Sequence, residues 1–430
     1  MPPGAFWAQF SIEQQFFLHL IGQARTAGQE AALLTLAQEV NWTAFMALAE
    51  AALYPYLDYC VTTRLPTAPI PDPVRQTLAR ATRSNAMLHL QRRAVSKTIL
   101  QALAQQHIPV IVLKGAALAE QVYPQPYRRT MGDLDLLIPG ERLTDVLTSL
   151  QALGFRAPKH HDQTWYYTHA QAHDPTAVSW PLLCPQTALL VEIHPQLETC
   201  QPPFTQSLEQ VWARSRATSL DGLPCRVLCP EDCLEHLCIH LAEHHGFEQG
   251  FRPLLDILLY LTRYDTTWDW PGFAAAAQQH GTAPWLYLTL HLARHLLGAP
   301  IPDAFFTAMP PPQALDAAAA LAIEQLWYAT HFRVPSGVYT AQATPLRHLP
   351  GVLWQRLRTW CQDDLNAWPT PPRMLRMVRS TATYLMQTHV PQLRQAWRNG
   401  DLAPARRQRA VQLYHGRSRL RALMSPSTPC

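Results

Sequence analysis

The sequence lacks any apolar run long enough to cross a membrane. Its most apolar stretch, residues 283–297, is interrupted by His291, Arg294 and His295, whereas a spanning helix needs roughly 20 apolar residues. The first residues lack the basic and apolar segments of a signal peptide, so none is expected. The nine cysteines are odd in number and include no Cys-x-x-Cys pair, which favours a reducing compartment. These absences together predict a cytoplasmic protein.

Charge is also scarce, and it is unevenly distributed. Only 15% of the 430 residues are charged and 48% are apolar, which excludes general disorder and is enough for two or three domains with buried cores. Lysine occurs only at positions 97, 114 and 159. Residues 351–430 hold 13 Arg and three Asp, a net charge of +10. Because the whole chain has a net charge of +4, residues 1–350 carry a net charge of −6.

The basic C-terminal segment has two interpretations. Its arginines could bind RNA or another polyanion, with Trp397 and Tyr414 stacking on bases. Alternatively, they form a helical face that docks on the acidic body of the protein. The arginines concerned are Arg394, Arg398, Arg406, Arg407, Arg409, Arg417, Arg419 and Arg421.

Hydrophobic periodicity predicts an α+β fold that is mostly helical. Apolar residues recur at helical spacing in the first hundred residues, where Ser11 and Gln14 form a capping-box pattern. Short apolar runs then predict strands over residues 108–113, 134–138 and 188–193. The expected regions are an N-terminal helical region (1–106), a sheet-containing core (107–200), a helical region that packs on the core (201–330) and a basic helical extension (331–430).

One predicted strand carries two acidic residues on the same face. In the run Gly132-Asp-Leu-Asp-Leu-Leu-Ile138, side-chain alternation places Asp133 and Asp135 together, and it turns Leu134 and Leu136 toward a core. Two carboxylates so close repel each other unless a cation lies between them. The pattern therefore favours a divalent-metal site for phosphate chemistry, and the alternative is a strand end whose acids are merely solvated.

Two neighbouring features favour the metal site. Lys114 and Gly115 follow the first predicted strand, and a glycine at a strand-to-helix turn lets backbone N–H groups approach phosphate. Lys114 adds a positive charge in a chain that otherwise uses arginine. Glu192 is a lone acid in the third apolar strand, so it needs a partner, and a metal ion shared with the aspartates would supply one.

Several motifs, taken together, resemble a known family. They are Val112-Leu-Lys-Gly-Ala-Ala-Leu-Ala119, Arg129-Thr-Met-Gly-Asp-Leu-Asp-Leu-Leu137, Leu153-Gly-Phe155, Val191-Glu-Ile-His194, Pro230-Glu-Asp-Cys-Leu-Glu-His-Leu237 and Arg252-Pro-Leu-Leu-Asp-Ile257. Over roughly residues 10–300, the chain resembles the uncharacterised nucleotidyltransferase family of the polymerase β-like superfamily. The resemblance implies a small mixed β-sheet nucleotidyltransferase core flanked by helical regions.

The same resemblance implies a set of site residues. The implied catalytic residues and metal ligands are Asp133, Asp135 and Glu192, which would hold two Mg²⁺ ions, with Mn²⁺ as an alternative. The implied nucleotide-binding residues are Lys114, Gly115, Ala116 and Arg129. Ala116 stands where many superfamily members have serine, so one hydroxyl contact to phosphate is missing.

The implied reaction is transfer of an NMP group from a nucleoside triphosphate to a hydroxyl, with release of pyrophosphate. ATP is the first donor expected, although no residue selects it over the other triphosphates. The acceptor stays open among a small molecule, a peptide or protein, and RNA. The alternative is a non-catalytic binding protein that kept the fold and holds a peptide or protein partner; the complete set of three carboxylates argues against it, and the missing serine argues for it.

Three nearby features each have two interpretations. Arg129 could hold a phosphate with two hydrogen bonds, or it could form a salt bridge that stabilises its loop. Asp256 could act in the site, but its spacing favours an i,i+4 pair with Arg252. His160 and His161 could touch the substrate, although a pair of loop histidines is more often a surface feature.

A stripe of cysteine and histidine residues offers a competing metal site. Zn²⁺ binds such ligands, but Pro230 interrupts the stripe and three histidines on successive helical turns do not easily reach one ion. We therefore favour a helix packed against the core, with its cysteines acting as small apolar residues. The residues of the stripe are Cys225, Cys229, Cys233, His236, His240 and His244.

Overall fold

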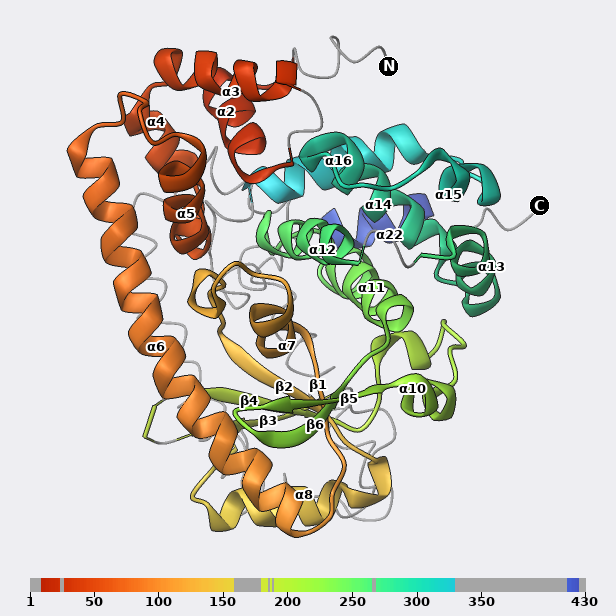
Figure 1. The fold of residues 1–430 in the computed structure, drawn as a ribbon. Helices are drawn as coiled ribbons and strands as arrows, with labels where there is room; N and C mark the ends of the chain where they lie inside the picture. Colours follow the sequence, from red (N-terminus) through yellow and green to blue (C-terminus); the bar gives the residue numbers. More distant parts are fainter. Residues whose placement is uncertain are drawn as a thin grey trace, which may run out of the picture.

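A computed structural model of the chain describes residues 9–23, 27–157, 179–184, 186–187, 189–264, 268–328 and 416–424. In this part of the chain, helices surround a six-stranded mixed sheet (Figure 1). The predicted α+β, mostly helical fold is therefore confirmed. His160, His161 and most of the basic C-terminal segment, with Trp397 and Tyr414, lie outside the described residues.

The N-terminal helices begin where the sequence places their caps. The Ser11 hydroxyl accepts a hydrogen bond from the Gln14 backbone N–H at 3.3 Å, and the Gln14 side chain accepts one from the Ser11 N–H at 3.0 Å, so the predicted capping box is present. The elements before the sheet are α2 (Ile12–Ile21), α3 (Ala27–Glu39), α4 (Trp42–Leu48), the 3₁₀ turn η1 (Ala51–Leu53), α5 (Tyr54–Arg64) and α6 (Asp72–Gln105).

The sheet runs in the order β3-β4-β2-β1-β6-β5. Its strands are β1 (Ile111–Val112), β2 (Asp133–Leu137), β3 (Trp180–Leu183), β4 (Leu190–His194), β5 (Arg216–Leu220) and β6 (Leu223–Val227). The pairs β2–β4 and β1–β6 are parallel, and the other neighbours are antiparallel. Between β1 and β3 lie α7 (Lys114–Gln121), η2 (Pro126–Arg128), η3 (Gly140–Arg142) and α8 (Leu143–Ala152).

The sheet is larger than the sequence predicted. The strands β3, β5 and β6 were not expected, and the β5–β6 hairpin lies beyond residue 200, where only helices were expected. A two-residue turn, Asp221-Gly222, joins β5 to β6, and both residues have positive φ, +53° and +78°. This is the geometry of a type I′ hairpin turn, for which Asp-Gly is a favoured pair.

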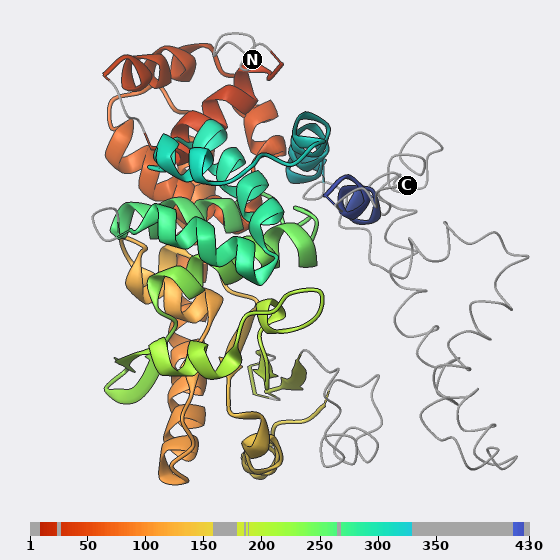
Figure 2. The same ribbon diagram turned by 90° about the vertical axis from the view of Figure 1, so that its right-hand side faces the viewer.

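Most of the remaining described helices lie on the same side of the sheet as the N-terminal region (Figure 1). After β4 come η4 (Glu198–Cys200), α10 (Leu208–Arg214), α11 (Pro230–Ile239), the π-helical turn η5 (His240–His244), α12 (Arg252–Arg263), α13 (Trp270–His280), α14 (Ala283–Leu297), α15 (Asp303–Ala308) and α16 (Leu315–Tyr328). The C-terminal helix α22 (Gly416–Met424) packs beside α16 (Figure 2). None of the described helices combines the length and the apolar character that a membrane span requires.

Two apolar layers use opposite faces of the sheet. Leu134, Leu136, Val191 and Ile193 face α8 and the end of α6, where they form one buried cluster. The opposite face contributes Leu137 to a smaller cluster and also carries the acidic residues described below. The alternation of side chains along β2 therefore separates a packing face from a polar face, as predicted.

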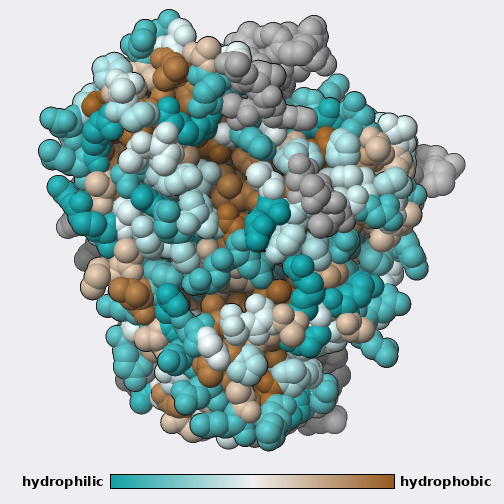
Figure 3. Space-filling model, in the orientation of Figure 1, coloured by the Kyte–Doolittle hydropathy of each residue, from teal (hydrophilic) through white to brown (hydrophobic). Residues whose placement is uncertain are grey.

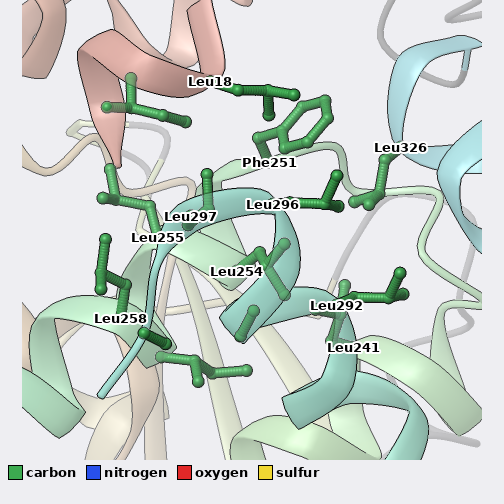
Figure 4. Close-up of a cluster of buried hydrophobic side chains, with 14 of the residues drawn as sticks. Leu18, Leu241, Phe251, Leu254, Leu255, Leu258, Leu292, Leu296, Leu297 and Leu326 are labelled. Carbon is green, nitrogen blue, oxygen red and sulfur yellow. The ribbon is translucent and has the colours of Figure 1, made fainter. Parts of the chain in front are cut away.

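The largest apolar cluster joins the N-terminal helices to the later ones. Leu18 of α2, Leu254 and Leu255 of α12, Leu296 of α14 and Leu326 of α16 are all buried in it (Figure 4). The outer surface is mostly hydrophilic in the view of Figure 3, with apolar residues visible toward its middle. The regions before and after the sheet thus share one core.

Helix α6 connects this cluster to the sheet. Its first half buries Val74 and Leu78 in the large cluster, and its second half buries Ile99 and Leu103 against the sheet. At roughly 1.5 Å per residue, its 34 residues span about 50 Å. In Figure 1 it runs along one side of the molecule, from the N-terminal helices to α8.

Candidate active site

The predicted acids come together because β2 and β4 are adjacent and parallel. In this register Asp135 lies beside Glu192, and Asp133 lies beside Leu190. Paired residues in neighbouring strands point to the same face, so Asp133, Asp135, Glu192 and also His194 share the polar face. All four line a cavity of about 240 Å³ between the sheet and the helices above it.

Three of these side chains are spaced as metal ligands would be. One ligand atom from each of Asp135, Glu192 and His194 lies within 4.8 Å of the others, and no other such group occurs among the described residues. His194 Nε2 lies 2.9 Å from Asp135 Oδ1 and 3.7 Å from Glu192 Oε2. Asp133 lines the same cavity but is outside this group. Sequence reasoning missed His194, although its position two residues after Glu192 places both on one face of the strand.

Lys114 compensates one carboxylate of the cavity. Its Nζ lies 3.1 Å from Asp135 Oδ1 and 3.9 Å from Glu198 Oε1, and its backbone has a positive φ of +42° at the start of α7. Burial opposes the charge of Lys114, but Asp135 and Glu198 outweigh burial and raise its pKa. Burial also opposes ionisation of Asp135, yet Lys114 and His194 lower the pKa of this carboxyl.

The other two predicted acids are poorly compensated. Burial, and then the nearby charge of Asp135, raise the pKa of Asp133. The same two causes, in the same order, raise the pKa of Glu192. Both shifts mean that the ionised carboxylates lack sufficient positive charge around them, which is the condition that a bound cation would relieve.

A buried glutamate that the sequence did not single out faces the cavity from η4. Glu198 lies 3.1 Å from Nδ1 of His236 and 3.1 Å from Nδ1 of His240. His240 begins the π-helical turn, a geometry that often occurs at functional sites. Burial and then Lys114 lower the pKa of His240 to about 4, so its imidazole is neutral at neutral pH. Contacts between residues about 40 positions apart create this arrangement, and no local pattern announces it.

Arg129 forms the buried salt bridge that was one of its two interpretations. Its Nε and Nη2 donate to the two carboxylate oxygens of Asp256 at 2.9 and 2.7 Å, and the Tyr123 hydroxyl also donates to Asp256 at 2.7 Å. The expected pair of Asp256 with Arg252 is therefore wrong, because Asp256 is occupied by Arg129. Arg129 still lines the cavity, but as a fixed part of its wall.

Gly115 and Ala116, both implied by the resemblance to bind the nucleotide, differ in their surroundings. A Cβ atom at Gly115 would lie 2.5 Å from Arg129 Nη1, so glycine is required for the close approach of this guanidinium. Gly115 also lines the cavity, at the N-terminus of α7, where no side chain caps the free N–H groups. The Ala116 side chain instead packs into the apolar cluster around the sheet and is not part of the cavity lining.

The cysteines of the competing zinc site are packing residues. Cys225 belongs to the cluster around the sheet, and Cys233 packs against the large cluster. Burial raises the pKa of both Cys229 and Cys233 to about 12, so these thiols stay protonated in the metal-free protein. Among the described residues, no group with metal-ligand spacing contains a cysteine. His240 and His244 instead line the candidate active site.

Arg417 and Arg421, in the part of the basic C-terminus that the structure describes, dock on the body. The Arg417 Nε donates to the Glu243 carbonyl at 3.1 Å, and Arg421 pairs with the Glu243 carboxylate. Leu420 and Met424 are buried in the large cluster. Of the two interpretations, α22 thus adopts the docked one; the remaining arginines of the segment, apart from Arg419, lie outside the described residues.

The candidate active site lies within a region of the chain that matches a known protein family. A family model described as "Uncharacterised nucleotidyltransferase" matches residues 38–298, which include every residue that lines the cavity. The chain belongs to this family. Membership in this nucleotidyltransferase family supports a general role in nucleotidyl transfer with a nucleoside triphosphate as substrate.

Other comparisons add little to this assignment. The chain is similar to an antigenic nucleotidyltransferase-like protein from Paracoccidioides brasiliensis, whose crystal structure is known. The sequence identity is 19%, the TM-score is 0.29, and the match covers 50% of this chain and 96% of that chain. A likeness at this level supports no inference about the fold or the activity. No curated protein matches the chain significantly.

Proposed function

We propose that this nucleotidyltransferase transfers an NMP group, AMP in the first instance, from a nucleoside triphosphate to a hydroxyl acceptor. The acceptor oxygen forms a bond to the α-phosphorus, and the bond from this phosphorus to the bridging oxygen breaks. The hydroxyl proton goes to a base, and pyrophosphate leaves. The observation that carries the proposal is the group of Asp135, Glu192 and His194, with Asp133 beside it, in one cavity.

The donor set fits a divalent cation. Two carboxylates suit Mg²⁺ or Mn²⁺, and the imidazole of His194 favours Mn²⁺ over Mg²⁺. The raised pKa values of Asp133 and Glu192 also fit a site that lacks positive charge. A divalent ion supplies neutralisation of charge on the phosphate oxygens when it is bound.

The residues that line the cavity have distinct roles in this proposal. Asp133, Asp135 and His194 would hold the cation, and Glu192 would complete its ligand set and accept the proton of the acceptor hydroxyl. Lys114 and the free N–H groups at the start of α7, beside Gly115, orient the phosphates. The contribution to the rate is mainly positioning and charge neutralisation, as in other phosphoryl-group transfers.

Labelled nucleotides test the proposal directly. Purified protein is incubated with each α-³²P-labelled NTP, Mg²⁺ or Mn²⁺, and a cell lysate, and the fraction that takes up label is identified. We expect label transfer by the wild type and none by Asp133→Asn or Glu192→Gln. Calorimetry without lysate measures metal-dependent NTP binding. If the wild type binds no NTP, the enzyme proposal is wrong, and the protein is better described as a partner-binding member of the fold.

A further inference from the structure

Arg252 is a positive charge without an ionic partner in the cavity wall. Its Nε is shielded from solvent and makes no hydrogen bond, and its Nη1 makes only a long one, 3.4 Å, to the Thr130 carbonyl. No carboxylate of the described residues lies within ion-pair distance, 4.0 Å, of its guanidinium. A buried cation with unused donors is unfavourable unless a ligand supplies the missing partner.

The neighbouring acid cannot serve as this partner. Asp256, one helical turn after Arg252, gives both carboxylate oxygens to Arg129. Burial, and next the proximity of the Arg129 charge, lower the pKa of Arg252. The two arginines thus differ: Arg129 forms a buried ion pair, whereas Arg252 forms none, and the nearby charges of Asp256 and Asp133 offset its charge only in part.

The backbone around Arg252 is held firmly at a helix N-terminus. Arg252 is the first residue of α12, and a buried carboxylate offsets the positive end of the helix dipole there. The N–H of the preceding residue, Phe251, donates to the buried Glu50 carboxylate at 2.5 Å. Arg252 and Pro253 both line the cavity that contains the predicted carboxylates.

We propose that Arg252 binds the non-bridging oxygens of the polyphosphate chain of the bound nucleotide. This inference rests on the proposed function, and it identifies the residue that recognises the triphosphate part of the substrate. A guanidinium can hold two phosphate oxygens at once, which fixes the orientation of the chain as well as its charge. In this arrangement the carboxylates of β2 and β4 bind the divalent cation, and Arg252 binds the polyphosphate anion.

The experiment uses inorganic tripolyphosphate and ATP as probes, each with Mn²⁺, and measures their affinities by calorimetry. The variants are Arg252→Gln, Arg252→Lys and, as a matched control, Arg263→Gln, which changes an exposed arginine on the same helix. We expect Arg252→Gln to weaken both probes at least about tenfold. Arg252→Lys keeps the positive charge but loses the planar guanidinium that can bind two phosphate oxygens at once, so we expect a smaller loss of affinity. Arg263→Gln should bind like the wild type, and Mn²⁺ alone should bind all variants equally.

The outcomes separate this inference from the proposed function. If Arg252→Gln binds tripolyphosphate as the wild type does, the role of Arg252 is refuted even where label transfer is observed. If tripolyphosphate binding depends on Arg252 but no label is transferred, the polyphosphate site stands and the transfer reaction does not. A wild type that binds neither probe overturns both. Should Arg252→Gln fail to fold, the affinity of Arg252→Lys decides, and wild-type affinity there refutes the proposal.

Discussion

Two aspartates on the same strand should respond to the same substitution in opposite ways. Asp135 is 3% exposed and lies 3.1 Å from Lys114 Nζ and 2.9 Å from His194 Nε2. Asp133 lines the same cavity, but burial and Asp135 raise its pKa. The Asp135→Asn change therefore removes the partner of a buried cation, whereas Asp133→Asn removes a repulsion. The proposed metal site alone, without the Lys114 contact, would predict equal effects.

The magnitude follows from the contacts that remain. Breaking a buried ion pair from one side costs about 3–5 kcal/mol. Glu198 stays 3.9 Å from Lys114 in the Asp135→Asn variant, so we expect the lower end, about 3 kcal/mol. For Asp133→Asn we expect a change in the free energy of unfolding within about 0.5 kcal/mol, in the direction of greater stability.

Urea denaturation at pH 7 with EDTA measures these differences in the metal-free protein. The three proteins should share one m value, so that shifts in the midpoint report stability. Adding Mn²⁺ then stabilises the wild type by mass action, and both variants should show a smaller gain. Equal losses in the two variants without metal, or a greater loss in Asp133→Asn, would show that we have misjudged what the Lys114–Asp135 contact contributes.

Three more predictions concern other parts of the structure. Gly115→Ala should lower the free energy of unfolding by about 1–3 kcal/mol, because its Cβ would lie 2.5 Å from a fixed guanidinium nitrogen, while Gly132→Ala, with no atom within 4 Å, should be nearly neutral; denaturation curves of the pair that coincide would contradict this. The hydrogen bond to Glu235 raises the pKa of His280, so its stabilising contribution is complete below the unfolded pKa of about 6.5 and is lost as pH rises through the folded value. The stability gap between wild type and His280→Gln should thus be larger at pH 5.5 than at pH 9, and a gap independent of pH would exclude this pair as its source. His194→Gln should weaken Mn²⁺ binding more than Mg²⁺ binding in competition calorimetry, since imidazole is a better ligand for Mn²⁺, and an equal loss would argue that the ring only orients its neighbours.

Local alternation explains why the acids could be predicted from the sequence. The positions of Asp133 and Asp135 on one face depend only on the period of a strand, which is two residues. The same rule applied to Glu192 would have added His194 to the site. Likewise, Asp221-Gly222 is a favoured pair for a two-residue hairpin turn, and it was a local signal for the β5–β6 hairpin. These omissions were readable from neighbouring residues.

The cationic wall of the cavity could not be read in this way. Arg129 meets Asp256 across 127 positions of the chain, and the i,i+4 spacing of Arg252 and Asp256 suggested a different pair. Which of two arginines an aspartate neutralises depends on how α12 packs against the loop that carries Arg129, and helical spacing carries no information about this. The role of Gly115 is similar, because the constraint comes from a guanidinium that arrives from another segment.

Helix α6 gives this architecture a mechanical property. Its two ends are embedded in separate apolar clusters, and its middle is bonded to the loop that carries Arg129, where Asn85 Nδ2 donates to the Tyr127 carbonyl at 2.6 Å. The helix therefore sets the spacing between the sheet, which carries the carboxylates, and α12, which carries Arg252. Moving the sheet and α12 apart would bend α6 or detach one of its ends from its apolar cluster. The stiffness of a helix remote from the chemistry thus limits how far the cavity can open.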